Sequence, residues 1–93
     1  MPTIHLLIKG KVQGVFYRAS AKEVADKLHL RGWIRNTVHG HVEAIVNGPV
    51  EKLKKFIEWC WQGPERADVK EVIETPREET EYNSFTVQRG KLF

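Results

Sequence analysis

The sequence TIHLLIKGKVQGVFYRASAKEVADKLHL, residues 3–30, changes its hydrophobic period from two to about 3.6 within a short glycine-containing segment. Apolar and polar residues alternate through Thr3–Lys9, which predicts a β-strand. Leu7 breaks that alternation, so we expect a central strand covered on both faces. From Ala19 to Leu30 the apolar residues recur every three or four positions, which predicts a helix. The stretch therefore predicts a strand, a glycine-rich turn and a helix, the first half of a split βαβ unit.

The middle of the chain adds a hairpin and a second helix. Gly32–Thr37 and His41–Asn47 are predicted strands joined at His39-Gly40, where glycine suits a positive φ. Gly48-Pro49 is expected to open a helix that ends at Gly63-Pro64. The predicted buried stripe of this helix consists of Leu53, Phe56, Ile57 and Cys60.

The C-terminal third predicts two further strands separated by a polar loop. Ala67–Glu74 is the first strand, and Lys70-Glu71 interrupts its apolar pattern, which indicates a β-bulge or an edge position. Thr75–Ser84 contains Pro76 and several acidic residues and is expected to be a loop. Phe85–Arg89 then predicts a fifth, short strand.

The element order β-α-β-β-α-β plus one short strand predicts an α+β fold. We expect a ferredoxin-like split βαβ sandwich, in which an antiparallel sheet carries two helices on one face. The 93 residues are expected to form a single domain, residues 1–93. This fold supports enzymes, RNA binders and regulatory modules, so it does not by itself assign a function.

Composition places weak limits on the function. The apolar runs are much shorter than the ~20 residues that a membrane span needs, and no secretory signal is visible. Cys60 is the single cysteine and cannot form an internal disulfide, so we expect a cytoplasmic location. The net charge of +3 would suit an anionic partner, either a small phosphorylated molecule or a nucleic acid.

The segment Lys11–Arg18 has two physical features that favour an anion. It precedes a helix N-terminus, where unpaired backbone N–H groups carry partial positive charge, and glycine lets such groups converge. Arg18 adds a permanent charge with a planar fork that matches phosphate oxygens, although a cation at this end of a helix costs typically about 0.3–1 kcal/mol. From these residues alone, an anion site and a plain turn with a surface arginine both remain open. The segment lacks the Walker and G-x-G-x-x-G spacings.

Two segments, GKVQGVFYR at residues 10–18 and GWIRNTVHGHVEAIVNG at residues 32–48, closely resemble the signature segments of the acylphosphatase family. The resemblance covers nearly the whole chain. It implies hydrolysis of the mixed anhydride between a carboxylic acid and phosphate, without a metal or other cofactor. It also implies that Arg18 holds the phosphoryl oxygens and that Asn36 orients the attacking water, as the two catalytic residues. The implied phosphate cradle is formed by the backbone N–H groups of Gln13, Gly14, Val15, Phe16, Tyr17 and Arg18.

The implied reaction explains why these segments contain no obvious base. The leaving carboxylate has a pKa of roughly 4 and needs no general acid. Phosphoryl transfer through a loose transition state mainly requires positioning and charge stabilisation. The expected partners are a small-molecule acyl phosphate as substrate and inorganic phosphate as product and inhibitor. We expect a monomer that binds neither nucleic acid nor membrane.

Three positions depart from the residues that the family usually shows. Ile34 stands where valine or a smaller residue is common, and a core absorbs such a change by repacking. His29 stands at a helix end where glycine is common, and His39 stands in the hairpin turn. Both positions are compatible with a left-handed backbone, and the sequence leaves open whether the two histidines adopt it. His39 is interpreted as a turn residue. Packing roles are expected for Trp33 beside the site, for Trp59 and Trp61 in or at the rim of the core, and for Cys60.

Three other functions compete with this prediction. An RNA-binding module of the same topology needs exposed aromatic residues on one strand, and HVEAIVNG at residues 41–48 has none. A phosphate or metabolite sensor would bind without turnover. A domain of a larger carbamoyl-transfer protein would use the same fold, but the short chain disfavours that alternative.

Overall fold

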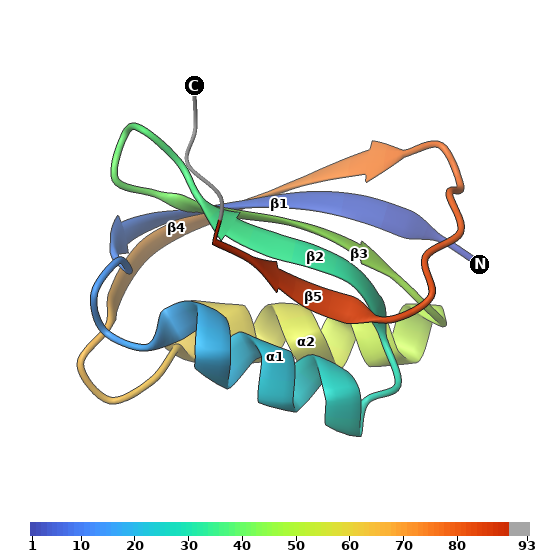
Figure 1. The fold of residues 1–93 in the computed structure, drawn as a ribbon, viewed down its shortest axis with the longest axis horizontal. Helices are drawn as coiled ribbons and strands as arrows, with labels where there is room; N and C mark the ends of the chain where they lie inside the picture. Colours follow the sequence, from blue (N-terminus) through green and yellow to red (C-terminus); the bar gives the residue numbers. More distant parts are fainter. Residues whose placement is uncertain (90–93) are drawn as a thin grey trace.

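The computed structural model describes residues 1–89 and has two helices packed on a five-stranded sheet (Figure 1). The strand order is β4-β1-β3-β2-β5, and both helices lie on the same face of the sheet. The elements are β1 (Thr3–Lys11), α1 (Tyr17–Lys27), β2 (Arg31–Asn36), β3 (Val42–Asn47), α2 (Val50–Gln62), β4 (Asp68–Arg77) and β5 (Phe85–Gln88). The predicted α+β sandwich is therefore confirmed. Residues 90–93 of the expected single domain lie outside the described residues.

The sheet is mixed and not wholly antiparallel as predicted. The pairs β1–β3, β1–β4 and β2–β3 are antiparallel, but β5 lies parallel to β2, with Gly32 opposite Phe85. The cause is the course of residues 78–84, which connect β4 at one edge of the sheet to β5 at the other. β5 thereby covers the edge of β2 next to helix α1.

β1 is central in the sheet, but the prediction that both its faces are covered is wrong. Leu6 and Ile8 are fully buried beneath the helices, whereas His5 and Leu7 on the other face are only partly buried. No helix of residues 1–89 lies on that face (Figure 1). The core thus occupies one side of the sheet, and it includes the predicted helical residues Ala21, Ala25, Leu53, Phe56 and Cys60.

Helix α1 begins two residues earlier and ends three residues earlier than predicted. It begins after Phe16, which has a left-handed backbone with φ 63° and ψ 23°. At the other end, the N–H of Leu30 donates to the carbonyl of Ala25 and that of His29 donates to Asp26, at 2.9 and 3.1 Å. This is a Schellman motif, and His29 with φ 58° occupies the position that glycine usually takes. The sequence left the backbone conformation of His29 open, and in the structure it is left-handed.

His39 is not left-handed, which answers a question that the sequence left open; in the β2–β3 turn the positive φ of 86° belongs to Gly40. Glycine takes this conformation without a steric cost, so its neighbour does not need to. Strand β4 also differs from its predicted bounds, because it continues past Glu74 to Arg77. A proline within it is tolerated because β4 is an edge strand.

The irregular pattern of β4 has the predicted cause. Lys9 pairs with Glu71 but Gly10 pairs with Val69, so Lys70 is an extra residue in a β-bulge. A Cβ atom on Gly10 would collide with the backbone carbonyl of Asp68, and the φ of Gly10 is 125°. The predicted bulge and the predicted edge position are both confirmed.

Candidate active site

A cavity of about 470 Å³ lies where the β1–α1 loop and the end of β2 meet. In Figure 1 this loop and the β2–β3 turn occupy the same end of the sheet. The cavity brings Arg18 and Asn36, 18 residues apart in the sequence, to one place. Its lining consists of Val12, Gly14, Phe16, Tyr17, Arg18, Ala19, Asn36, Val87 and Arg89.

The β1–α1 loop is anchored to the core by buried side chains, while the residues between them are exposed. Val15 is 6% exposed and Tyr17 is 1% exposed, and the Tyr17 hydroxyl donates to the carbonyl of Cys60 at 2.7 Å. Burial raises the pKa of Tyr17 well above its usual range, so this hydroxyl stays protonated as a donor. Gly14 has φ 73°, and a Cβ atom built on it would meet nothing within 4 Å. The loop is therefore anchored by alternate residues while Gly14 and Phe16 face solvent.

The backbone N–H groups of this loop are left without acceptors. In residues 1–89, the N–H groups of residues 13–19 donate to no backbone carbonyl and to no side chain. Those of Tyr17, Arg18 and Ala19 belong to the first turn of α1, where intrahelical partners do not exist. Unpaired donors at a helix N-terminus form an anion-binding site.

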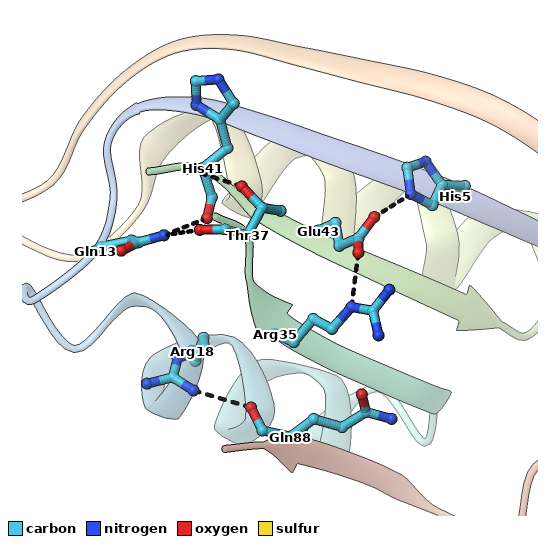
Figure 2. A network of polar contacts seen from close by, with 8 residues as sticks. All are labelled: His5, Gln13, Arg18, Arg35, Thr37, His41, Glu43 and Gln88. Atoms are coloured by element: carbon cyan, nitrogen blue, oxygen red, sulfur yellow. Dashed lines mark hydrogen bonds and ion pairs between the residues drawn. The ribbon is translucent and has the colours of Figure 1, made fainter. Parts of the chain in front are cut away.

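Arg18 is the second residue of α1 and is half-buried. Its Nη1 donates to the carbonyl of Gln88 in β5 at 3.0 Å (Figure 2). Among the described residues this is the single hydrogen bond of the guanidinium, which leaves donors for a ligand. β5 thus orients one edge of the arginine beside the cavity.

Asn36 is the last residue of β2 and is also half-buried. Its Oδ1 is buried and has no hydrogen-bond partner in residues 1–89. An unpaired buried acceptor costs free energy unless a ligand or a water donates to it. Because Asn36 lines the cavity, this oxygen can accept a hydrogen bond from a molecule bound there.

Gln13 has a role that the sequence did not reveal. Its Nε2 donates to the carbonyls of Thr37 and His41, at 2.9 and 2.8 Å (Figure 2). The side chain thus ties the β1–α1 loop to the β2–β3 turn and sets the position of the loop relative to Asn36. Of the six predicted cradle residues, Gln13 and Val15 do not line the cavity. Val12, Ala19, Val87 and Arg89 line it and were not predicted.

Other conspicuous residues lie outside the cavity. Trp33 packs beneath the guanidinium of Arg35, 4.6 Å from Cζ to the ring centroid, and does not line the cavity. Trp59 packs on the core beside Tyr17, as predicted. Trp61 is 49% exposed, so its predicted place in or at the rim of the core is wrong. It lies off the buried stripe of α2, which consists of Leu53, Phe56 and Cys60. Burial raises the pKa of Cys60 to about 12, and this fully buried thiol is inert as predicted.

A polar cluster lies on the sheet face away from the helices (Figure 2). Glu43 accepts hydrogen bonds from His5 at 2.9 Å and from the Nε of Arg35. Partial burial by itself raises the pKa of the Glu43 carboxyl, but the two hydrogen bonds and the nearby positive charge outweigh it and lower the pKa. The cluster joins β1, β3 and β2 and does not line the cavity.

Residues 1–89 contain neither a cluster of metal-ligating side chains nor a membrane-spanning helix. No group of three or more His, Cys, Asp or Glu side chains is arranged to hold a metal ion. No helix in this part of the chain combines the length and the apolar character that a membrane crossing requires.

The fold and the site together define an α+β domain with an anion-binding loop. Comparison with known proteins then places it in a family. A sequence model described as Acylphosphatase matches residues 4–87. An acylphosphatase from Marinobacter nauticus is 54% identical over 68 residues, which are 73% of this chain and 74% of that protein.

Solved structures agree with the sequence comparison. The structure of an acylphosphatase from Coxiella burnetii superposes with a TM-score of 0.90 at 38% identity, covering 94% of this chain and 92% of that one. The crystal structure of acylphosphatase from Bacillus subtilis gives a TM-score of 0.91 at 30% identity, covering 95% and 99%. The chain belongs to the acylphosphatase family. It is accordingly a hydrolase that acts on acyl phosphates.

Proposed function

We propose that the chain hydrolyses acyl phosphates by in-line attack of a water that Asn36 orients on a phosphoryl group held by Arg18 and the loop N–H groups. The bond between phosphorus and the carboxyl oxygen breaks, and the products are a carboxylate and inorganic phosphate. The observation that carries the proposal is the meeting of three unsatisfied groups at one cavity. These groups are the N–H donors of the loop residues that line the cavity (Gly14, Phe16, Tyr17 and Arg18), the free edge of Arg18 and the Oδ1 of Asn36.

The loop and Arg18 match the charge of the phosphoryl group. Its oxygens accept hydrogen bonds from backbone N–H groups, and the guanidinium adds a full positive charge. Because one Nη1 hydrogen already bonds to Gln88, the guanidinium is oriented before substrate binds. Gln13 holds the same loop against the β2–β3 turn and so positions the cradle without contacting the phosphate through its side chain.

Asn36 positions the attacking water and does not transfer a proton. Its Oδ1 accepts a hydrogen bond from the attacking water, which aims the water at phosphorus on the side opposite the leaving carboxylate. The proton of that water passes to a phosphoryl oxygen. The carboxylate leaves as an anion of low basicity, so no acid has to protonate it.

The remaining features of the proposal follow from the same site. Inorganic phosphate, as a product that fits the cradle, is a competitive inhibitor. The chain acts as a monomeric single domain, needs no metal or other cofactor, binds no nucleic acid and works in the cytoplasm. The buried and protonated Cys60 fits a reducing compartment, since it makes no use of disulfide chemistry.

Hydrolysis of benzoyl phosphate by the purified chain in the presence of EDTA tests the proposal. Arg18→Ala and Asn36→Ala should each lower kcat by on the order of 10²–10³ while the circular dichroism stays that of the folded chain. Val38→Ala is a matched control, because Val38 is 72% exposed in the neighbouring turn and does not line the cavity. A metal requirement, or normal turnover in either active-site variant, contradicts the mechanism. Binding of phosphate without turnover would indicate a sensor instead.

A further inference from the structure

Phe16 is placed at the cavity in a way that packing does not explain. It lines the cavity and is 76% exposed, while the residues on both sides of it, Val15 and Tyr17, are buried. Its ring therefore contributes little to the core. In residues 1–89 it is the most exposed of the large hydrophobic residues.

The backbone of Phe16 is also unfavourable for its side chain. A left-handed conformation, with φ 63°, is uncommon for a bulky residue, whereas glycine or asparagine takes it at a lower cost. The same position is the N-cap of α1, where Phe16 makes no side-chain cap hydrogen bond. An exposed apolar side chain in a strained conformation at a cavity is a reason to look for a ligand contact.

The proposed reaction geometry places the acyl group opposite Asn36 in the cavity that Phe16 also lines. In-line attack places the water and the leaving carboxylate on opposite sides of phosphorus. With the water at Asn36 and the phosphoryl group on the loop, the acyl group extends away from Asn36. Phe16 carries the exposed aromatic ring of the described cavity lining, since the other aromatic residue there, Tyr17, is 1% exposed.

We propose that Phe16 forms an acyl subsite that makes the enzyme prefer acyl phosphates with a flat, apolar acyl group over those with a short alkyl group. This inference rests on the proposed function, because it takes the phosphoryl position from it. The carboxyl carbon of the substrate is planar and is conjugated with an aromatic acyl group, so the whole group can lie against a ring. An aromatic contact of this kind changes a rate constant ratio by about tenfold or less.

Selectivity between two substrates tests the subsite. The measured quantity is the ratio of kcat/KM for benzoyl phosphate to kcat/KM for acetyl phosphate, which cancels any effect on the shared phosphate cradle. Phe16→Asn suits the left-handed backbone and removes the ring, and we expect it to lower the ratio about tenfold. Phe16→Tyr keeps the ring and should have the wild-type ratio. Trp61→Ala removes an exposed aromatic that does not line the cavity and should leave the ratio unchanged.

A binding measurement separates this inference from the proposed function. Calorimetric titration compares benzylphosphonate, methylphosphonate and inorganic phosphate. In Phe16→Asn the affinity for benzylphosphonate should fall relative to methylphosphonate. Wild type that binds no phosphate and cleaves neither substrate overturns the proposed function. An unchanged ratio in a folded Phe16→Asn overturns the subsite alone; if that variant does not fold, an unchanged ratio in Phe16→Leu does so.

Discussion

The two strand–helix junctions of the fold differ in how well their residues suit the start of a helix. β1 is joined to α1 by residues 12–16, and β3 is joined to α2 by Gly48 and Pro49 alone, at the other end of the sheet (Figure 1). The second junction favours its helix: Pro49 is an extended N-cap, and an acidic residue, Glu51, lies in the first turn. It is also filled, because a Cβ atom on Gly48 would meet the side chain of Leu30.

The first junction disfavours its helix at each of these points. Its N-cap is a left-handed phenylalanine, its first turn has no acidic residue, and Arg18 places a cation at the positive end of the helix. A Cβ atom on Gly14 would meet open space. The residues that disfavour the start of α1 therefore lie at the cavity that Asn36 also lines. The unsatisfied donors of the first junction support its proposed role in binding the phosphoryl group, whereas the second junction is proposed to be structural.

Exchanging the first-turn charges for alanine should separate the two junctions most clearly. Arg18→Ala removes the charge that holds the phosphoryl group and should lower kcat by on the order of 10²–10³. Its free energy of unfolding should stay close to wild type, since removing a cation at a helix N-terminus offsets the lost hydrogen bond to Gln88. Steady-state kinetics and urea denaturation measure the two quantities.

Glu51→Ala is the matched variant at the second junction, and the opposite result is expected. Loss of the acidic residue should lower the free energy of unfolding by about 0.3–1 kcal/mol and leave kcat and KM at their wild-type values. The comparison fails if Glu51→Ala impairs turnover in the folded protein, or if Arg18→Ala remains active.

Adding a methyl group to a glycine at each junction gives the next largest effect. Gly48→Ala should lower the free energy of unfolding by about 1–3 kcal/mol, because the new Cβ displaces the 3% exposed Leu30 from the core. Gly14→Ala meets no neighbour, so its cost is limited to the left-handed backbone, and its main effect should be weaker inhibition by inorganic phosphate. Denaturation curves and phosphate inhibition constants measure the two effects. Equal loss of stability and unchanged phosphate affinity in both variants would contradict the assignment.

The hydrogen bonds of Gln13 connect the first junction to the β2–β3 turn, which follows Asn36. Gln13→Ala removes two donors to the β2–β3 turn and should lower kcat/KM by about tenfold, because the cradle is then less well placed relative to the water. Gln13→Glu should lower kcat/KM further, since its carboxylate would face the carbonyls of Thr37 and His41. A positioning role predicts that kcat falls more than phosphate affinity, whereas a direct phosphate contact would change both together.

Much of the fold follows from local periodicity. The strand and helix patterns gave every element of residues 1–89 in order, and the interruption at Lys70 predicted the bulge. The errors arose where the deciding contact is distant in sequence. Nothing within residues 85–89 shows that β5 pairs with β2, and hence runs parallel to it. The sequence also left open whether His39 is left-handed, and in the structure Gly40 beside it has the positive φ.

The candidate site was predicted mainly through the resemblance to the family. Residue chemistry alone indicated only a possible anion site at Arg18, whereas the roles of Arg18 and Asn36 as catalytic residues came from the two signature segments; the structure brings both residues to one cavity. The left-handed Phe16, the Gln13 link and the contribution of β5 were not predicted. Each depends on backbone conformation or on a partner more than 20 residues away, and periodicity carries no information about either.

The acid sensitivity of the fold should come from the open face of the sheet and not from either junction, and this is the smallest effect expected. The pKa of Glu43 is lower in the folded chain than in the unfolded one, so the carboxylate contributes stability above the unfolded pKa of about 4.3. That contribution is lost as the pH falls through the folded pKa. Glu43→Gln should therefore be less stable than wild type at pH 7, and the difference should close as the pH falls below about 4. Melting temperatures of both proteins between pH 7 and pH 3 measure this, and kcat at pH 7 should be unaffected because Glu43 does not line the cavity. A difference that stays constant across this range would place the acid-sensitive carboxylate elsewhere.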